Sequence, residues 1–265
     1  MEDPVHVAAS FDARAATYGR NEWHRRYAQA LVGHASLRTG QHVLDAGVGT
    51  GFAAVAIAQA VGRDGRVVGV DLSRGMLDQA RATLDVAGLH WVELLQRDAT
   101  DLHDIRDGTF DAVICAAALL YMPVDAALVE WRRLLRPGGL VAFSTMQRGS
   151  PRAGALFREC ARAFGVLLDD PSEALGSADA CQSALERAGF VEIRVVPGDV
   201  ELAAADLSLA WAANMRSAGH AAVRSLAPAD LEHLRQRFEE ALGDAHANLA
   251  QPAERAAVLY AIGRR

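Results

Sequence analysis

The residues best suited to chemistry form one short run. Residues 43–51 read VLDAGVGTG, an apolar strand end and an aspartate followed by three alternate glycines, Gly47, Gly49 and Gly51. Glycine has no Cβ, so the backbone can approach a ligand closely. The apolar run FAAVAIAQAV follows at 52–61. The glycines therefore lead from a strand into the first turn of a helix, where unpaired N–H groups and the helix dipole favour a polar ligand.

The spacing of these glycines disfavours two common nucleotide loops. The dinucleotide fingerprint G-x-G-x-x-G needs glycine where this chain has Phe52. A P-loop needs Gly-Lys-Ser/Thr, and the chain contains no lysine. The missing lysine also excludes Schiff-base chemistry and the Tyr-x-x-x-Lys pair of short-chain dehydrogenases. A NAD-dependent oxidoreductase is the least favoured function.

Four more segments follow the loop in order: RVVGVDLS at 66–73 with Asp71, VELLQRDATD at 92–101 with Asp98, FDAVICAAALLYM at 110–122, and LLRPGGLVAFST at 134–145. Together with D-x-G-x-G-T-G at the loop, they resemble the class I S-adenosylmethionine (SAM) methyltransferases. The resemblance covers roughly residues 40–146. The rest of the chain resembles small-molecule members of the ubiquinone-biosynthesis type more loosely.

Apolar runs that alternate with helical patterns predict a parallel, doubly wound α/β sheet. Strands are expected near 41–46, 66–71, 91–96, 110–115, 139–145, 190–196 and 256–262. Helices are expected near 22–34, 50–61, 73–87, 124–135, 150–168 and 177–189. The resemblance implies seven strands in the order 3-2-1-4-5-7-6, with strand 7 antiparallel.

The whole chain, 1–265, is expected to form a single domain, with residues 1–34 as an N-terminal cap. Residues 1–20 look partly mobile, anchored by aromatic side chains. Residues 200–254 form a helical insertion before the last strand, with helices near 206–219 and 228–243. Trp211 and Met215 share one apolar face of the first helix. The second helix is expected to have an apolar face as well. The two faces either roof a substrate pocket together with the helix near 22–34, or pack on the sheet's helices or at a dimer contact.

The resemblance also implies a SAM site, with S-adenosylhomocysteine as product. Asp71 would hold the ribose hydroxyls and Asp98 would face the adenine. Tyr18 ends FDARAATY, which is similar to an F-D-x-x-A-x-x-Y element that closes over the cofactor in relatives. The expected cofactor-binding residues are Tyr18, Asp45, Gly47, Val48, Gly49, Thr50, Gly51, Asp71, Leu72, Met76, Asp98, Ala99, Thr100, Cys115 and Ala116.

Methyl transfer from a sulfonium requires alignment of the acceptor and exclusion of water, which lower the barrier by roughly 7–11 kcal/mol. A general base is optional. No residue stands out as one, and the weak candidates are His24, His220 and Tyr121. The expected substrate-side residues are Tyr27, Tyr121, Met122, Trp211 and Met215.

Composition and charge limit the kinds of partner that the protein can bind. The formal charge is −6 and the arginines are scattered, which argues against a nucleic-acid substrate. No apolar stretch reaches the length of a membrane span, and the acidic start MEDPVHVAAS does not predict a signal peptide. A cytoplasmic monomer or homodimer is expected. Isolated cysteines and unpaired histidines predict no metal site.

These observations predict a SAM-dependent methyltransferase that acts on a small, fairly apolar metabolite of secondary metabolism. Two alternatives keep the fold. One binds SAM but catalyses a cyclisation or a decarboxylation. The other is a SAM-binding module without catalytic activity.

Overall fold

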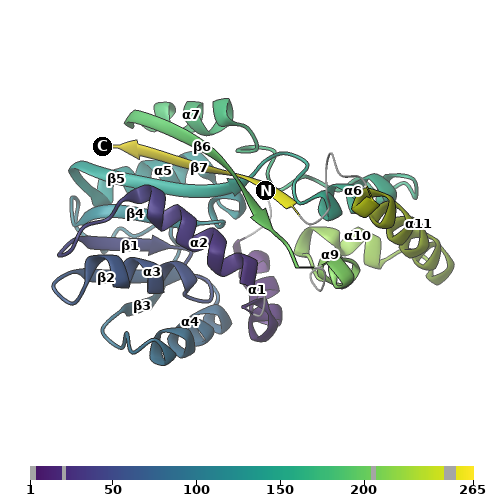
Figure 1. Ribbon diagram of the computed structural model, residues 1–265, viewed down its shortest axis with the longest axis horizontal. Helices are drawn as coiled ribbons and strands as arrows, with labels where there is room; N and C mark the ends of the chain where they lie inside the picture. The colour runs from purple at the N-terminus through teal and green to yellow at the C-terminus, as the bar shows by residue number, and fades with distance from the viewer. Residues whose placement is uncertain (1–3, 20–21, 204–206, 248–254) are drawn as a thin grey trace.

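A seven-stranded sheet forms the centre of the molecule (Figure 1). The computed structural model describes residues 4–19, 22–203, 207–247 and 255–265. The strands are β1 (His42–Ala46), β2 (Arg66–Asp71), β3 (Glu93–Gln96), β4 (Phe110–Ala116), β5 (Leu135–Met146), β6 (Val191–Glu201) and β7 (Arg255–Arg264). Their order is β3-β2-β1-β4-β5-β7-β6, and β7 runs antiparallel to both neighbours. The predicted topology is confirmed.

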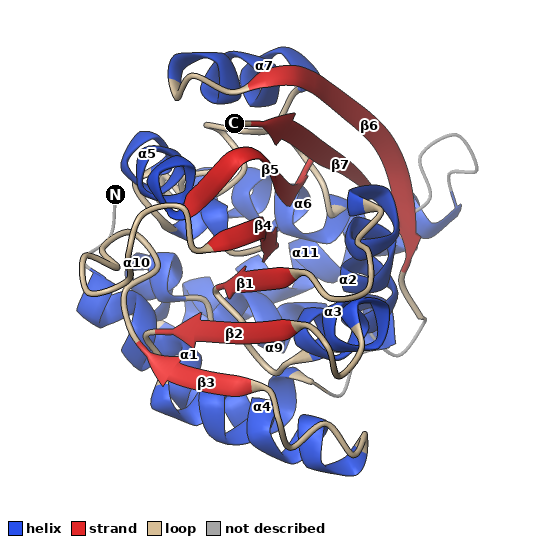
Figure 2. Cartoon of the chain, turned by 90° about the vertical axis from the view of Figure 1, so that its left-hand side faces the viewer, coloured by secondary structure: helices blue, strands red, loops and turns tan. Residues whose placement is uncertain are grey.

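Helices cover both faces of the sheet (Figure 2). The longer ones are α1 (Pro4–Tyr18), α2 (Glu22–Ala35), α3 (Phe52–Val61), α4 (Arg74–Val86), α5 (Val124–Leu134), α6 (Arg152–Arg162), α7 (Ala178–Arg187) and α11 (Pro228–Ala247). The shorter ones are η1 (Leu119–Tyr121), α9 (Ala210–Met215), η2 (Ala218–His220) and α10 (Ala221–Arg224). No helix in the described ranges is long and apolar enough to cross a membrane.

The period-two pattern of the strands divides the core. Val43 packs with α2, α3 and α4 on one face, whereas Leu44 packs with α5 and α7 on the other. Successive side chains of a strand point to opposite faces, and a parallel sheet is buried on both. The near-continuous apolar strands of the sequence are explained by these two cores.

Three local predictions differ from the structure. Helix α1 occupies residues 4–18, where a partly mobile segment was expected, because Asp12 and Ala15 dock it on α4. The helix expected at 206–219 is divided into α9, η2 and α10, with 204–206 outside the described residues. Strand β5 starts before the Pro-Gly-Gly turn, and its pairing with β4 shifts register there.

The helices between β6 and β7 form a third hydrophobic cluster with α6. Figure 1 shows α6, α9, α10 and α11 grouped beyond the ends of the strands, at one end of the molecule. Helix α1 touches this group at η2. The predicted limits of the insertion, 200–254, include residues 248–254, which lie outside the described part of the chain.

Candidate functional site

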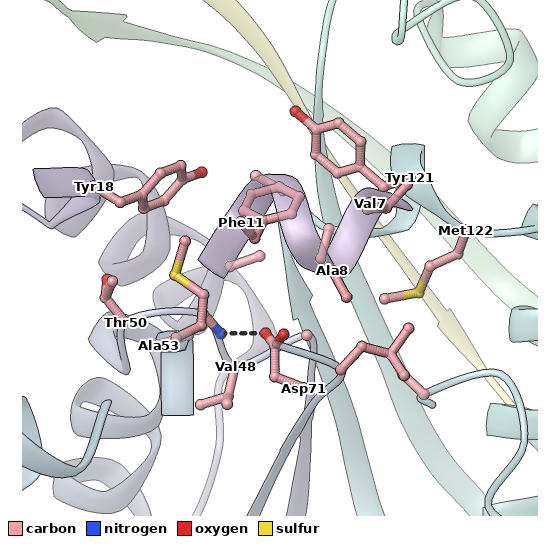
Figure 3. Close-up of a pocket in the computed structure, with 18 of the residues that line it drawn as sticks. Val7, Ala8, Phe11, Tyr18, Val48, Thr50, Ala53, Asp71, Tyr121 and Met122 are labelled. Atoms are coloured by element: carbon pink, nitrogen blue, oxygen red, sulfur yellow. Dashed lines mark hydrogen bonds between the residues drawn. The ribbon is translucent and has the colours of Figure 1, made fainter. Parts of the chain in front are cut away.

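A cavity lies at the carboxyl ends of β1, β2 and β4, the edge at which open α/β sheets bind ligands. The glycine loop, the ends of β2 and β4, and helices α1 and α2 form its walls (Figure 3). Of the residues predicted to bind cofactor, the cavity is lined by Tyr18, Gly47, Val48, Gly49, Thr50, Asp71, Leu72, Met76, Asp98, Ala99, Thr100 and Ala116.

The glycine loop has a shape that only glycine allows at Gly47. Its φ is +75°, and a Cβ there would lie 2.5 Å from the Cβ of Ala118. The N–H groups of Gly47 and Val48 both donate to the Val70 carbonyl, at 2.9 Å each. The loop is therefore tied to β2 on one side and packed on the end of β4 on the other. This cradle fits a ligand that approaches the backbone closely.

Asp71 is fixed at the tip of β2. One carboxylate oxygen accepts the Gly49 N–H and the other accepts the Ser73 N–H, both at 2.9 Å. Burial raises the pKa of Asp71, and these two N–H groups counter part of that rise. Each oxygen keeps acceptor capacity. The carboxylate can therefore receive two hydroxyls of a ribose.

Asp98 stabilises the neighbouring loop rather than standing free. Its Oδ1 accepts the Thr100 N–H and the Thr100 hydroxyl, both at 2.8 Å. Helix α5 fixes this loop from behind, because Trp131 donates its indole N–H to the Ala99 carbonyl at 2.8 Å. The loop at this end of the cavity is thus held by hydrogen bonds from Asp98 and from Trp131.

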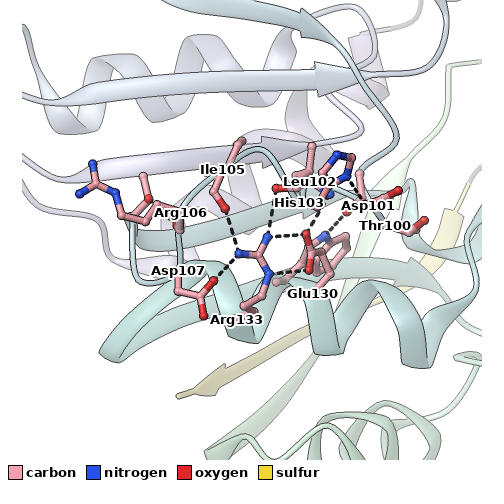
Figure 4. A network of polar contacts seen from close by, with 12 residues as sticks. Thr100, Asp101, Leu102, His103, Ile105, Arg106, Asp107, Glu130 and Arg133 are labelled. Carbon is pink, nitrogen blue, oxygen red and sulfur yellow. Dashed lines mark hydrogen bonds and ion pairs between the residues drawn. The ribbon is translucent and has the colours of Figure 1, made fainter.

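Arg133 of α5 organises the rest of that loop (Figure 4). Its guanidinium donates to the Leu102 and Ile105 carbonyls and to the carboxylates of Glu130 and Asp107. Glu130 in turn accepts the Leu102 N–H at 2.8 Å. Sequence reasoning missed this network, since its members are far apart in the chain.

Three residues predicted to bind cofactor lie behind the cavity wall. Gly51 is the N-cap of α3, and a Cβ there would lie 3.1 Å from the backbone of Ala80. Cys115 is fully buried. Asp45 is also fully buried, and neither of its oxygens makes a hydrogen bond of good geometry with a described residue. Burial, with the nearby Asp71 carboxylate second, raises the pKa of Asp45 to about 8.

Helix α1 covers the cavity with the residues of FDARAATY. Phe11 and Tyr18 face the cavity, above Asp71 in Figure 3. Their rings contact edge to face, with centroids 5.9 Å apart. Pro4, Val7 and Ala8 extend the same lining face. Sequence reasoning missed these three, although their spacing of three to four residues with Phe11 is a helical stripe.

The other two residues of that motif dock α1. Asp12 Oδ1 accepts the Ser73 hydroxyl at 2.6 Å and the Gly75 N–H at 2.7 Å, at the start of α4. Gly75 leaves room for the helix, since a Cβ there would lie 3.1 Å from the Cβ of Ala15. Asp12 therefore connects the cover to the end of β2.

Comparison with known proteins gives the family. A family model described as a methyltransferase domain matches residues 43–139. A demethylmenaquinone methyltransferase of Staphylococcus saprophyticus is 32% identical over 54% of this chain and 59% of its own length. An aklanonic acid methyltransferase of a Streptomyces species is 32% identical over 52% and 64%. The chain thus covers less than two thirds of the length of these two relatives.

A nocamycin O-methyltransferase of Saccharothrix syringae is 30% identical over 76% of this chain and 79% of its own length. The chain belongs to the class I SAM-dependent methyltransferases. Two solved structures share the fold. The YcgJ protein of Bacillus subtilis has a TM-score of 0.59 and 18% identity, and the match covers 91% of this chain and 98% of that one. The [4+2]-cyclase SpnF has a TM-score of 0.56 and 20% identity, and the match covers 90% of this chain and 80% of that one.

The residues predicted on the substrate side fall into two groups in the structure. Tyr27, Tyr121 and Met122 line the cavity. Trp211 and Met215 are not among the lining residues and pack in the cluster of α6, α9 and α11. The Trp211 ring lies 5.6 Å from Phe157 and 6.0 Å from Phe238, between centroids. Their apolar face packs against α6 and α11.

The two candidate histidines also differ in their surroundings. His24 lines the cavity and stacks on Tyr18, with ring centroids 4.6 Å apart. Burial lowers the pKa of His24 to about 4, so the ring is neutral at pH 7. His220 lies outside the lining, stacks on Phe157 and bonds the Asn214 carbonyl at 2.8 Å. No cluster of three metal-binding side chains occurs among the described residues.

Proposed function

We propose that the protein transfers a methyl group from SAM to a small, fairly apolar metabolite of secondary metabolism. The observation that carries this proposal is a cavity with two chemically different walls. The glycine loop, Asp71 and Asp98 form a polar wall suited to the cofactor. Phe11, with the apolar face of α1, and Met122 form the wall where an acceptor would lie.

Each wall has a defined task in this proposal. SAM supplies an already activated methyl group when bound. Asp71 and the glycine loop fix its position, and Tyr18 on α1 covers it. The apolar wall orients the acceptor and excludes water, so alignment supplies most of the rate enhancement. No protein nucleophile takes part, and a base is needed only if the acceptor keeps its proton at neutral pH.

Relatives support an organic acceptor of modest size. Their names include aklanonic acid, nocamycin and demethylmenaquinone. The lining near the β4 end agrees with such acceptors, because it is made of Ala116, Ala117, Ala118, Tyr121 and Met122. The cover formed by α1 favours an enzyme over a SAM-binding module with an open site.

Two measurements test the function. Calorimetry should detect binding of SAM and S-adenosylhomocysteine. Asp71→Ala should weaken this binding about tenfold to several hundredfold, because hydrogen bonds to a charged group contribute roughly 1.5–3 kcal/mol each. A panel of phenolic, enolic and amine acceptors is then incubated with methyl-labelled SAM. Labelled product supports the proposal, and absence of cofactor binding contradicts it.

A second candidate function keeps the cofactor but not the transfer. The fold is shared with a [4+2]-cyclase, and the only histidine on the cavity wall of the described chain is neutral and weakly basic. A cyclisation or decarboxylation would give a new product that carries no labelled methyl group. The same incubation therefore separates the two reactions.

A further inference from the structure

The turn that follows β4 contains a residue in an unusual backbone conformation. Ala117 has a φ of +55°, in the left-handed region that favours glycine. It lies in the cavity wall, between Ala116 and Ala118. A residue with a Cβ adopts this conformation only when its surroundings hold it there.

A buried hydroxyl on the neighbouring strand holds this turn. Ser144 of β5 accepts the Ala117 N–H on its Oγ at 3.2 Å. The pairing of β4 with β5 ends at Ala116 and Ser144, so the next N–H has no strand partner. Ser144 is fully buried and does not itself line the cavity. Its hydroxyl therefore accepts the N–H that would otherwise lack a partner on the neighbouring strand.

The turn packs directly against the glycine loop. The Cβ of Ala118 occupies the space where a side chain on Gly47 would begin, and the Met122 methyl group lies 3.3 Å from the same point. Gly47 is bonded on its other side to Val70. A shift of the turn would therefore move the wall against which the glycine loop rests.

We propose that Ser144 is a positioning residue for the cofactor site. Its hydroxyl holds Ala117 in the left-handed conformation, and this keeps Ala118 against Gly47 in the shape that binds SAM. The inference rests on the proposed function, since it assumes that the cavity binds this cofactor.

Ser144→Ala tests the inference, with S-adenosylhomocysteine as the probe in calorimetry. Loss of the hydroxyl lets Ala117 relax, so only a fraction of molecules stays competent to bind. The expected loss of affinity is roughly 5- to 30-fold. Thr145→Ala is the matched control, because it removes the hydroxyl of the next buried residue of β5. It should leave the affinity unchanged.

A second substitution distinguishes positioning from general support of the sheet. Ala117→Gly allows a positive φ without the hydrogen bond. The double variant Ser144→Ala/Ala117→Gly should regain most of the lost affinity, which a general packing defect would not allow. If Ser144→Ala does not fold, Ser144→Cys replaces it, since a thiol is of similar size but a weak acceptor.

The outcomes separate this inference from the function on which it rests. A wild-type protein that does not bind the probe contradicts the proposed function. Wild-type binding that Ser144→Ala leaves unchanged overturns only the role of Ser144. Weakened binding that Ala117→Gly does not restore also overturns it, because the hydroxyl would then act by another route.

Discussion

Gly47 is constrained both by its positive φ and by its contact with Ala118, and comparison with Gly40 distinguishes the two effects. Gly47 and Gly40 both have a positive φ, +75° and +82°, but only Gly47 has a neighbour in the space of a Cβ. Both alanine variants should lose stability through the backbone, by about 1–2 kcal/mol. Gly47→Ala should also weaken S-adenosylhomocysteine binding by about tenfold or more, as expected for overpacking. Equal binding by the two variants in calorimetry would show that the contact with Ala118 is unimportant.

Asp45 should make stability depend on pH. Its pKa is raised from 3.8 to about 8 in the folded protein, so the folded state keeps a proton that the unfolded state has released. The stability from this proton is full below pH 3.8 and is lost progressively as the pH rises from there through about 8. An asparagine side chain at this position does not titrate. Asp45→Asn should therefore match the wild type near pH 4 and exceed it by on the order of 4 kcal/mol at pH 7.

Urea unfolding of the ligand-free protein at pH 4, 6 and 8 measures this difference. A gap between the two proteins that stays constant over the series would mean that Asp45 remains ionised when folded.

The Asp12 carboxylate supplies hydrogen bonds that attach α1 to the start of α4. Asp12→Ala removes the acceptor of the Ser73 hydroxyl and the Gly75 N–H. The expected cost is about 0.5–2 kcal/mol, as for loss of a helix cap. Hydrogen exchange should become faster across residues 4–18, and S-adenosylhomocysteine should dissociate faster. Thr17→Ala is the control, because the Thr17 hydroxyl donates to the Arg14 carbonyl within α1. Unchanged exchange in Asp12→Ala would show that α1 is held by its apolar contacts alone.

A packing defect in the cluster of α6, α9 and α11 should lower stability without changing cofactor affinity. Trp211→Ala removes a ring packed between Phe157 and Phe238, at an expected cost of roughly 3 kcal/mol in unfolding free energy. Affinity for S-adenosylhomocysteine should not change, since Trp211 is absent from the cavity lining. A fall in that affinity would contradict the separation. A rise in the KM of the acceptor would instead support a roof over the acceptor.

Features coded by neighbouring residues could be predicted from the sequence. The glycine loop and Asp71 belong to one strand–loop–helix–strand unit, so their spacing alone places them together. The docking of α1 could not be predicted, because Asp12 and Ser73 are 61 residues apart. The prediction of a single helix at 206–219 was wrong. The four-residue steps of Leu207, Trp211 and Met215 indicate a helix but do not show where it ends. Helix α9 stops at Met215, before Ser217 and Gly219.

The same limit applies to the whole molecule. The apolar strand pattern predicts two faces and two cores, and the structure has both. The third cluster was not predicted as a unit, because it joins α6 to helices about 50 to 80 residues later in the chain. The role of Ser144 could not be predicted, because nothing in the sequence of an apolar strand shows that its serine will bind a backbone group of the neighbouring strand.

The position of β7 has a consequence for biosynthesis. It is made last of the seven strands, yet it lies between β5 and β6 and pairs with both. Until it leaves the ribosome, β5 has an open edge and β6 has no neighbour. Open edges are the sites at which nascent chains pair wrongly. We therefore expect the interval between synthesis of β6 and of β7 to be a stage at which the nascent chain is open to wrong strand pairing.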